Sequence, residues 1–364
     1  MNPSGDRYAQ GLVKDLISRL QGLVKRPMRF MEVCGTHTVS IFRSGLRSII
    51  PEEIELISGP GCPVCVTSQG DIDAFIETAK KPGVTIATFG DLLRVPGTDG
   101  SLALQRAKGA DVEVVYSPMD ALQIAKFGRS REVVFLAAGF ETTIPGIAAT
   151  IKEAVGNGTG NFSIMPALKL MPPALNALLE ARDFRIDGLI CPGHVSAIIG
   201  AAAYRSIADG FKIPCVVAGF EPAGILMALI LLAEQVNEGR TEVENAYPSV
   251  VSWDGNTRAM EVMQEVFSPC DADWRGLGMI RQSGLCLRPE YGGFDARIRF
   301  GIKVMQPHEP KGCLCGDVIK GLTIPSNCPF FAAKCTPASP VGPCMVSSEG
   351  TCAAYYRYAI GICK

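Results

Sequence analysis

Short β-rich runs alternate with helical stretches through most of this chain. Each run ends in glycine, proline or small polar residues, which is the rhythm of βαβ units. Parallel strands need helical crossovers and become apolar on both faces, so the rhythm predicts an α/β fold. The runs form a first set and a second set: residues 29–33, 54–57, 84–88 and 112–116, then residues 133–137, 163–167, 188–191 and 214–218.

The two sets predict two tandem parallel-sheet, Rossmann-like α/β domains, which we place at residues 28–130 and 131–247. Residues 1–27 contain an amphipathic helical segment, which we expect to pack with the C-terminal domain. Beyond Pro248 the rhythm gives way to a helical stretch, a loop-rich region and a tail dense in Cys, Pro and Gly. Residues 248–364 therefore predict a cysteine-rich, mainly helical and loop domain, stapled by a metal group whose binding supplies folding free energy.

Charge and hydropathy exclude several classes of function. With 35 Lys and Arg against 36 Asp and Glu, the chain gives no sign of nucleic-acid binding. The first residues lack the pattern of a secretory signal, so we expect a cytoplasmic protein. The longest apolar run, residues 223–233, is about half the roughly 20 residues that a membrane span needs. We therefore expect no membrane span.

Fourteen cysteines without an export signal favour metal binding or catalysis over a disulfide framework. Free cysteine often behaves as a small buried hydrophobe. We assign that plain core role to five of them: Cys191, Cys215, Cys270, Cys286 and Cys363.

Four cysteines in the tail are spaced too widely for a zinc knuckle. Cys328, Cys335, Cys344 and Cys352 are separated by six, eight and seven residues, whereas zinc sites usually use close Cys-x2–4-Cys pairs. An iron–sulfur cubane is larger and accepts thiolates from separate loops, so it is the favoured interpretation. The nearby Cys313-Leu314-Cys315 supplies another ligand, a second redox pair, or simply two thiols on opposite faces of an extended segment.

Three further motifs carry candidate chemistry, each just after a predicted strand. Cys62 and Cys65, in Gly-Pro-Gly-Cys-Pro-Val-Cys, suit dithiol redox chemistry, with metal binding as the competing use and two inert buried cysteines as the least favoured interpretation. Cys34-Gly35-Thr36-His37 suits a transition-metal site, a cysteine activated by histidine, or a strand-end cysteine whose histidine caps a helix. His194, in Cys-Pro-Gly-His, is a functional candidate or a histidine satisfied by backbone at a helix start.

One four-residue motif occurs twice in the chain. Ala-Gly-Phe-Glu occurs at residues 138–141 and again at 218–221, each time after a predicted strand. Both copies sit where open α/β sheets bind ligands, although glycine can simply turn the strand, phenylalanine pack and glutamate cap a helix. Neither dinucleotide-binding nor Walker-type glycine motifs are present, so nucleotide binding has no support from a motif.

Taken in order, the motifs resemble those of the HypD family of hydrogenase maturation proteins. The likeness covers nearly the whole chain and rests on four stretches, with Tyr-Tyr-Arg-Tyr after the last tail cysteine: residues 34–38, 59–65, 191–194 and 340–347. It implies a scaffold that assembles the Fe(CN)2CO unit of nickel–iron hydrogenases, rather than a conventional turnover enzyme. It also implies the partner HypC, the cyanide donor HypE, and an indirect link to the hydrogenase large subunit.

The resemblance further implies a role for each motif. Cys34 would hold the iron together with a HypC cysteine, and His37 and His194 would lie near that iron, between the two α/β domains. Cys62 and Cys65 would form a thiol–disulfide pair. A 4Fe-4S cluster feeding electrons to that pair would be ligated by four cysteines: Cys328, Cys335, Cys344 and Cys352.

The chemistry is consistent with these roles. Iron that carries cyanide and carbon monoxide favours soft thiolate donors, and moving cyanide from sulfur to iron consumes electrons. A dithiol gives up two electrons at once, whereas a cubane normally passes one, so the Cys62/Cys65 pair bridges that mismatch. Two alternatives stay open: a non-redox iron-carrier scaffold with a structural cluster, and a zinc-stabilised thiol oxidoreductase.

Overall fold

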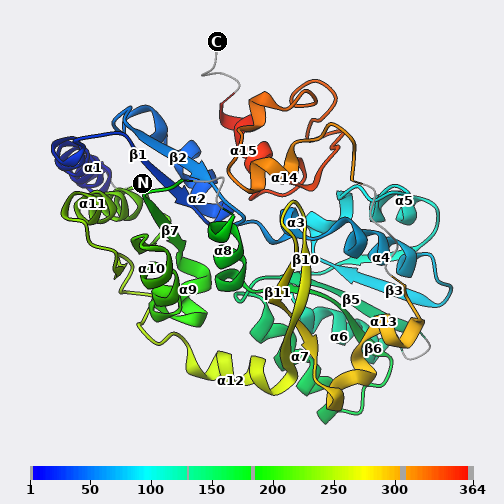
Figure 1. Ribbon diagram of the computed structural model, residues 1–364. Coiled ribbons are helices and arrows are strands. Elements are labelled where there is room, and N and C mark those ends of the chain that lie inside the picture. The colour runs from blue at the N-terminus through cyan, green and yellow to red at the C-terminus, as the bar shows by residue number, and fades with distance from the viewer. Residues whose placement is uncertain (1–2, 129–130, 182–184, 304–308, 360–364) are drawn as a thin grey trace.

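Two β-sheets form the centre of the molecule (Figure 1). The computed structural model describes residues 3–128, 131–181, 185–303 and 309–359. Sheet A is entirely parallel, in the order β2-β1-β7-β8-β9. Its strands are β1 (Met28–Glu32), β2 (Ile54–Ser58), β7 (Gly188–Pro192), β8 (Cys215–Ala218) and β9 (Val243–Asn245).

Sheet B has a parallel part and an antiparallel edge, in the order β10-β11-β6-β5-β3-β4. Strands β10 and β11 form a hairpin whose second strand pairs antiparallel with β6. The strands of this sheet are β3 (Val84–Thr88), β4 (Asp111–Val114), β5 (Glu132–Gly139), β6 (Phe162–Lys169), β10 (Phe267–Trp274) and β11 (Gly278–Leu287). Two parallel-dominated sheets with a cysteine-rich region confirm the predicted fold class.

All eight predicted strands are present, but grouping them by sequence order was wrong. Sheet A takes β1 and β2 from the predicted first set and β7 and β8 from the second, and sheet B takes the four strands between them. The chain leaves sheet A after β2, builds the parallel part of sheet B, and returns with β7 beside β1. Apolar runs identify strands, whereas they do not say which strands are neighbours.

Helices cover both sheets. The position of α1 differs from the one that we predicted. We expected the first helix to pack with the C-terminal domain, but Leu16 and Leu20 of α1 are buried in a core formed with α11. The helices are α1 (Pro3–Leu23), α2 (Gly35–Arg43), α3 (Pro63–Val66), α4 (Gln69–Ala79), α5 (Leu102–Ala107), α6 (Pro118–Phe127), α7 (Ile144–Gly156), α8 (Met171–Glu180), α9 (Gly193–Ile199), α10 (Arg205–Phe211), α11 (Pro222–Glu238), α12 (Thr257–Val266), α13 (Ala296–Phe300), α14 (Cys315–Ile319) and α15 (Thr351–Tyr358). Short 3-10 turns are η1 (Leu46–Ser48), η2 (Gly90–Arg94), η3 (Ala201–Tyr204), η4 (Pro289–Phe294), η5 (Pro325–Asn327) and η6 (Pro343–Met345).

The β10–β11 hairpin is the part of residues 248–364 that the sequence did not predict. The described part of this stretch is mainly helical and loop as expected, but residues 267–287 form a hairpin on the edge of sheet B. We expected Cys270 and Cys286 to be core residues, yet they form a disulfide across the hairpin, with Cα atoms 6.0 Å apart. Cys286 is exposed there. Cys191 and Cys215 are buried as predicted, and Cys363 lies outside the described residues.

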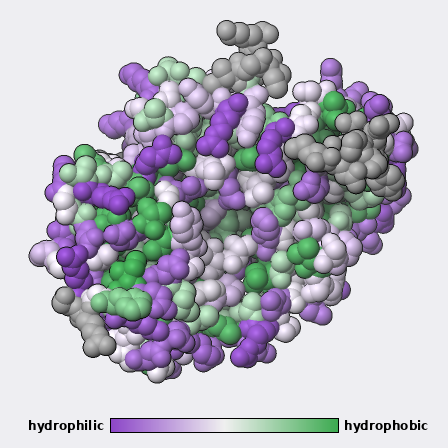
Figure 2. Space-filling view, turned by 180° about the vertical axis from the view of Figure 1, so that it is seen from behind, coloured by the Kyte–Doolittle hydropathy of each residue, from purple (hydrophilic) through white to green (hydrophobic). Residues whose placement is uncertain are grey.

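The C-terminal segment lies beside both sheets. Residues 313–358 fold into α14, η5, η6 and α15, which Figure 1 shows between the α2 side of sheet A and the α4 side of sheet B. Seen from behind, the surface shows patches of hydrophobic side chains among hydrophilic ones (Figure 2). Within the described ranges, no helix is long and apolar enough to cross a membrane.

Candidate functional site

The point where the strand order of sheet A reverses brings two predicted motifs together. From β1 the chain continues to β2 on one side, and from β7 it continues to β8 on the other side. The loops at the carboxyl ends of such a pair diverge and leave a crevice, which is where open α/β sheets bind ligands. Cys34 follows β1 and His194 follows β7, so both lie at this crevice.

The glycine-rich loop after β2 folds over Cys34. Gly61 accepts a hydrogen bond from the amide of Gly35 at 3.0 Å. A Cβ atom at Gly61 would lie 2.3 Å from the backbone nitrogen of Cys34, so only glycine fits this close approach. The loop thereby places Cys62 and α3 next to the crevice.

A cavity of about 290 Å³ opens at this crevice. Its polar or reactive side chains are those of Cys34, Thr142, His194 and Glu349. Thr142 follows β5 of sheet B and Glu349 precedes α15, so both sheets and the C-terminal segment build the cavity. The rest of the lining is mostly apolar and includes Val33, Phe140, Met171, Pro192, Val195 and Ile198.

Cys34 is protonated at neutral pH in this setting. Burial, followed by the negative charge of Glu349, raises the pKa of its thiol to about 11, although the backbone amides of His37 and Thr36 act in the opposite direction. Thr36 Oγ1 donates a hydrogen bond of 2.6 Å to Glu349 Oε1, which fixes the carboxylate beside the cavity. A metal that binds Cys34 must therefore displace its proton.

Sequence reasoning missed Glu349 and Thr142. Glu349 lies only two residues beyond the last tail stretch that we singled out, but a carboxylate among serines carries no pattern of its own. Thr142 directly follows the first Ala-Gly-Phe-Glu repeat, whose position at a strand end was the available signal.

His37 lies behind the cavity rather than in its wall. It is fully buried, and its Nε2 lies 2.9 Å from the carbonyl oxygen of Gly219, which can only accept, so Nε2 carries the proton. Burial lowers the pKa of His37 to about 4, and the ring is neutral. The ring of Phe220 contacts both histidines, with centroids 4.7 Å from His37 and 4.0 Å from His194.

Both Ala-Gly-Phe-Glu repeats support the sites by packing, and the glutamate of the first copy also caps a helix. Phe220 contacts the two histidines, while Phe140 stacks on Trp274 with centroids 5.9 Å apart and also lines the cavity. Glu141 Oε1 accepts a hydrogen bond of 2.9 Å from the amide of Met171. The glutamate therefore caps α8 rather than α7, the next helix in the chain.

Cys62 and Cys65 form a disulfide that is almost closed to solvent. Their exposed fractions are 5% and 1%, and their Cα atoms are 5.2 Å apart. Cys62 is the N-cap of α3, and its Sγ accepts a hydrogen bond of 3.1 Å from the amide of Cys65. Helix α3 packs against η6, the turn that carries Cys344.

All four predicted tail ligands meet in one pocket, which we call the cysteine pocket. It also contains both members of the nearby pair, so six thiols line it: Cys313, Cys315, Cys328, Cys335, Cys344 and Cys352. The amide of Cys352 donates to Cys344 Sγ at 3.3 Å, and the amide of Val341 donates to Cys335 Sγ at 3.3 Å. A Cβ atom at Gly342 would lie 3.3 Å from Cys313 Sγ, so this glycine lets the segments converge.

The donor set of this pocket fits an iron–sulfur cluster. Its donors are thiols, and Val318, Phe331 and Met345 make the remaining wall apolar. A hydrogen bond with Cys315, and then burial, raises the pKa of the Cys313 thiol. Among the described residues, no three His, Cys, Asp or Glu side chains are arranged to hold a single metal ion. Six thiols exceed the four ligands that one tetrahedral ion takes, and an iron–sulfur cluster accepts thiolates from separate segments.

Comparisons with known proteins agree with the motifs over almost the whole chain. A family model described as HypD, hydrogenase formation hypA family, matches residues 10–359. Hydrogenase maturation factor HypD2 of Bradyrhizobium diazoefficiens is 45% identical over 358 residues, which cover 96% of this chain and 94% of that protein.

Other organisms contain similar proteins. Hydrogenase maturation factor HypD of Escherichia coli is 45% identical over 347 residues, which cover 95% of this chain and 93% of that protein. A putative hydrogenase expression/formation protein of Methanocaldococcus jannaschii is 40% identical over 351 residues, which cover 96% of this chain and 98% of that protein. With a whole-length family match and relatives of this similarity, the chain belongs to the HypD family of hydrogenase maturation factors.

Proposed function

We propose that this chain is a redox-active scaffold that assembles the Fe(CN)2CO unit of nickel–iron hydrogenases together with HypC, and that HypE donates the cyanide. One observation carries the proposal: a lone thiol, a buried disulfide and a six-thiol pocket follow one another from the crevice of sheet A to the C-terminal segment. Cys34 faces the cavity, α3 lies beside it, and η6 joins α3 to the cysteine pocket.

Iron is the cargo of the cavity at the reversal point of sheet A. Cys34 supplies one thiolate to it, and a cysteine of HypC supplies another. The mostly apolar wall restricts water, while His194 and Glu349 supply polar groups beside the iron. His37 is neutral and holds the loop after β8 through Gly219, so it supports the cavity without facing it.

Cyanide transfer requires two electrons, which the Cys62/Cys65 dithiol provides. A thiocyanate on the donor, R–S–CN, accepts two electrons and leaves as R–S⁻ and CN⁻, and the cyanide binds the iron. The two thiols lose two electrons and two protons as the Cys62–Cys65 bond forms. Atoms and electrons balance without any further oxidant.

The next cycle requires that the disulfide be reduced again. Its burial keeps external reductants from both sulfurs, which supports an electron source inside the protein. A 4Fe-4S cluster held by Cys328, Cys335, Cys344 and Cys352, with Cys313 and Cys315 beside them, would supply these electrons one at a time. The packing of α3 on η6 supports this route because it joins the disulfide to Cys344.

The relay is tested on protein purified without oxygen and trapped with the Cys62–Cys65 bond closed. A photochemical one-electron donor is added, and mass spectrometry counts alkylated Cys62 and Cys65. Both thiols should appear in iron-loaded protein and in Cys215→Ala, a control for loss of a buried cysteine outside the pocket. They should stay closed in metal-free protein and in Cys344→Ala. No thiol release from iron-loaded protein would reject the relay.

The scaffold role is tested by infrared spectroscopy and metal analysis of the same preparations. Wild type co-expressed with the partner proteins should show cyanide and carbonyl stretches, iron and acid-labile sulfide. Cys34→Ala should lose the stretches but keep the sulfide, because the cysteine pocket is untouched. Cys62→Ala should stop maturation, whereas continued maturation would favour a non-redox iron carrier. Wild type without iron and sulfide would contradict the cluster.

A further inference from the structure

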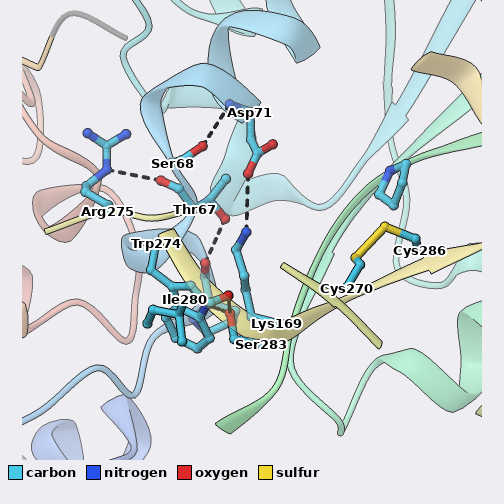
Figure 3. A network of polar contacts seen from close by, with 12 residues as sticks. Thr67, Ser68, Asp71, Lys169, Cys270, Trp274, Arg275, Ile280, Ser283 and Cys286 are labelled. Carbon is cyan, nitrogen blue, oxygen red and sulfur yellow. Dashed lines mark hydrogen bonds and ion pairs between the residues drawn. A yellow bond between two sulfur atoms is a disulfide. The ribbon is translucent and has the colours of Figure 1, made fainter. Parts of the chain in front are cut away.

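The β10–β11 hairpin reaches from the edge of sheet B to the end of α3, the helix that carries the Cys62–Cys65 disulfide. Figure 3 shows this contact at Thr67 and Trp274, together with the other disulfide, Cys270–Cys286. In its turn, the amide of Arg275 donates to the carbonyl of Val66 at 2.9 Å, and Nε donates to the carbonyl of Thr67 at 3.1 Å. These two carbonyls lie at the C-terminal end of α3, directly after Cys65. Arg275 therefore holds the last turn of the disulfide helix from outside.

The guanidinium of Arg275 also binds a residue beyond α3, which fixes its orientation. Both Nη atoms of Arg275 donate to Gln69 Oε1, at 3.2 and 3.1 Å. The neighbouring Trp274 is buried, and its Nε1 donates to Ser283 Oγ at 2.8 Å, which ties the two strands of the hairpin together (Figure 3). The hairpin thus presents Arg275 in one orientation.

The same turn touches the cysteine pocket. A Cβ atom at Gly276 would lie 2.6 Å from the Cα of Gly316, the residue after Cys315, so the two backbones are in direct contact. Gly276 has a φ of +78°, which also favours glycine. Arg275 is near enough for its charge to act on both Cys313 and Cys315. One side chain therefore lies between the disulfide helix and the cysteine pocket.

Among the residues that the structure describes, no buried carboxylate pairs closely with Arg275. Lys169 is equally buried, with an exposed fraction of 3%, but it pairs with Asp71 at 3.4 Å (Figure 3). In the described part of the chain, the carboxylate within 4 Å of Arg275 is that of Glu309, at 3.8 Å and half exposed. The other partners of the guanidinium are neutral oxygens. A buried cation is costly unless an anion lies close by, and thiolates in the cysteine pocket would provide one.

We propose that Arg275 is a positioning residue for the electron relay, which holds α3 against the cysteine pocket and provides the buried positive charge that stabilises the reduced, more negative state of the iron–sulfur centre. This inference rests on the proposed function. The positioning role explains why the β10–β11 hairpin ends beside both α3 and the cysteine pocket. It also explains why its turn contains an arginine and not an apolar residue.

The first test is a redox titration of the iron-loaded full-length protein, followed by visible absorption and electron paramagnetic resonance. Arg275→Met removes the charge with little loss of volume and should lower the ratio of reduced to oxidised centre about tenfold at a fixed potential. Arg275→Lys should keep most of the wild-type ratio. Arg281→Met removes an exposed arginine of the same hairpin and should change nothing. An unchanged ratio in Arg275→Met with full iron and sulfide would overturn the electrostatic role.

A second variant keeps the proposal testable if Arg275→Met fails to fold. Glu309→Gln removes the half-exposed carboxylate near Arg275 and should raise the same ratio, opposite in sign to the arginine variant. No shift, or a shift in the other direction, would count against the charge of Arg275.

Positioning has a readout that needs no metal. In metal-free full-length protein, backbone amides of residues 62–70 should exchange with deuterium at least threefold faster in Arg275→Met than in Arg281→Met. Equal exchange would overturn the positioning role. Wild type without iron and sulfide would instead overturn the proposed function, so the two failures are distinguishable.

Discussion

Thr36 donates a hydrogen bond of 2.6 Å to Glu349, which ties the helix after Cys34 to the segment that carries the last two pocket cysteines. Burial is the main reason why the pKa of Cys34 is raised, and the charge of the same carboxylate raises it further. One acidic side chain therefore joins the two thiol regions mechanically and adds to the rise in the pKa of the cavity thiol.

Replacing that carboxylate should make Cys34 more reactive. Below its pKa of about 11, alkylation of Cys34 should speed up tenfold per pH unit, because the thiolate is the nucleophile. Glu349→Gln keeps an acceptor for Thr36 but removes the charge, so alkylation at a fixed pH should be about threefold faster. Mass spectrometry of metal-free protein measures the rate at Cys34. Glu113→Gln, an exposed carboxylate of β4, is the control and should match wild type.

His37 should make the fold sensitive to acid. Its folded pKa of about 4 lies below the ordinary 6.5, so the unfolded chain binds a proton between these pH values that the folded chain does not. Stability is therefore retained above pH 6.5 and falls by about 3 kcal/mol as the pH drops to 4. Denaturant unfolding of wild type and His37→Gln across this range measures the difference. Parallel losses in both proteins would mean that another group is responsible.

Gly61 should tolerate no side chain. The Cβ of Gly61→Ala would lie 2.3 Å from the backbone nitrogen of Cys34, so the loop must move and take Cys62 with it. We expect a loss of roughly 2 kcal/mol or more in the free energy of unfolding. Gly146→Ala in α7 meets no atom within 4 Å and should be neutral or stabilising by up to about 1 kcal/mol. Thermal unfolding of both variants decides, and equal midpoints would contradict the close approach.

The Cys270–Cys286 bond should stabilise the hairpin. It closes a short loop with a sequence separation of 16, for which a disulfide typically contributes about 2–4 kcal/mol. Cys270→Ser with Cys286→Ser should lower the melting temperature. A mild reductant should lower wild type to the level of the variant and leave the variant unchanged, because Cys62–Cys65 is buried. If the reductant leaves the melting temperature of wild type unchanged, the Cys270–Cys286 bond does not stabilise the protein.

The sequence predicted the strands and the reactive residues better than it predicted their neighbours. Glycine after an apolar run located Cys34, Cys62 and His194 at strand ends, where the structure has them. The pairing of β1 with β7 could not be predicted, because a buried parallel strand looks alike beside any partner. The hairpin was missed because Cys270 and Asp271 interrupt the alternation at a bulge. Arg275 was missed because its role depends on three segments that meet only in the fold.

Because the chain crosses from sheet A to sheet B and back, the two sheets become complete at different times during synthesis. β1 and β2 leave the ribosome first, yet β1 keeps one edge open until Gly188 and the rest of β7 emerge. The parallel strands of sheet B become available in between, so they can assemble while the older pair waits. A nascent chain arrested before β7 would expose an apolar edge that invites aggregation. Fragments split at residue 130 would each contain strands of both sheets and complete neither.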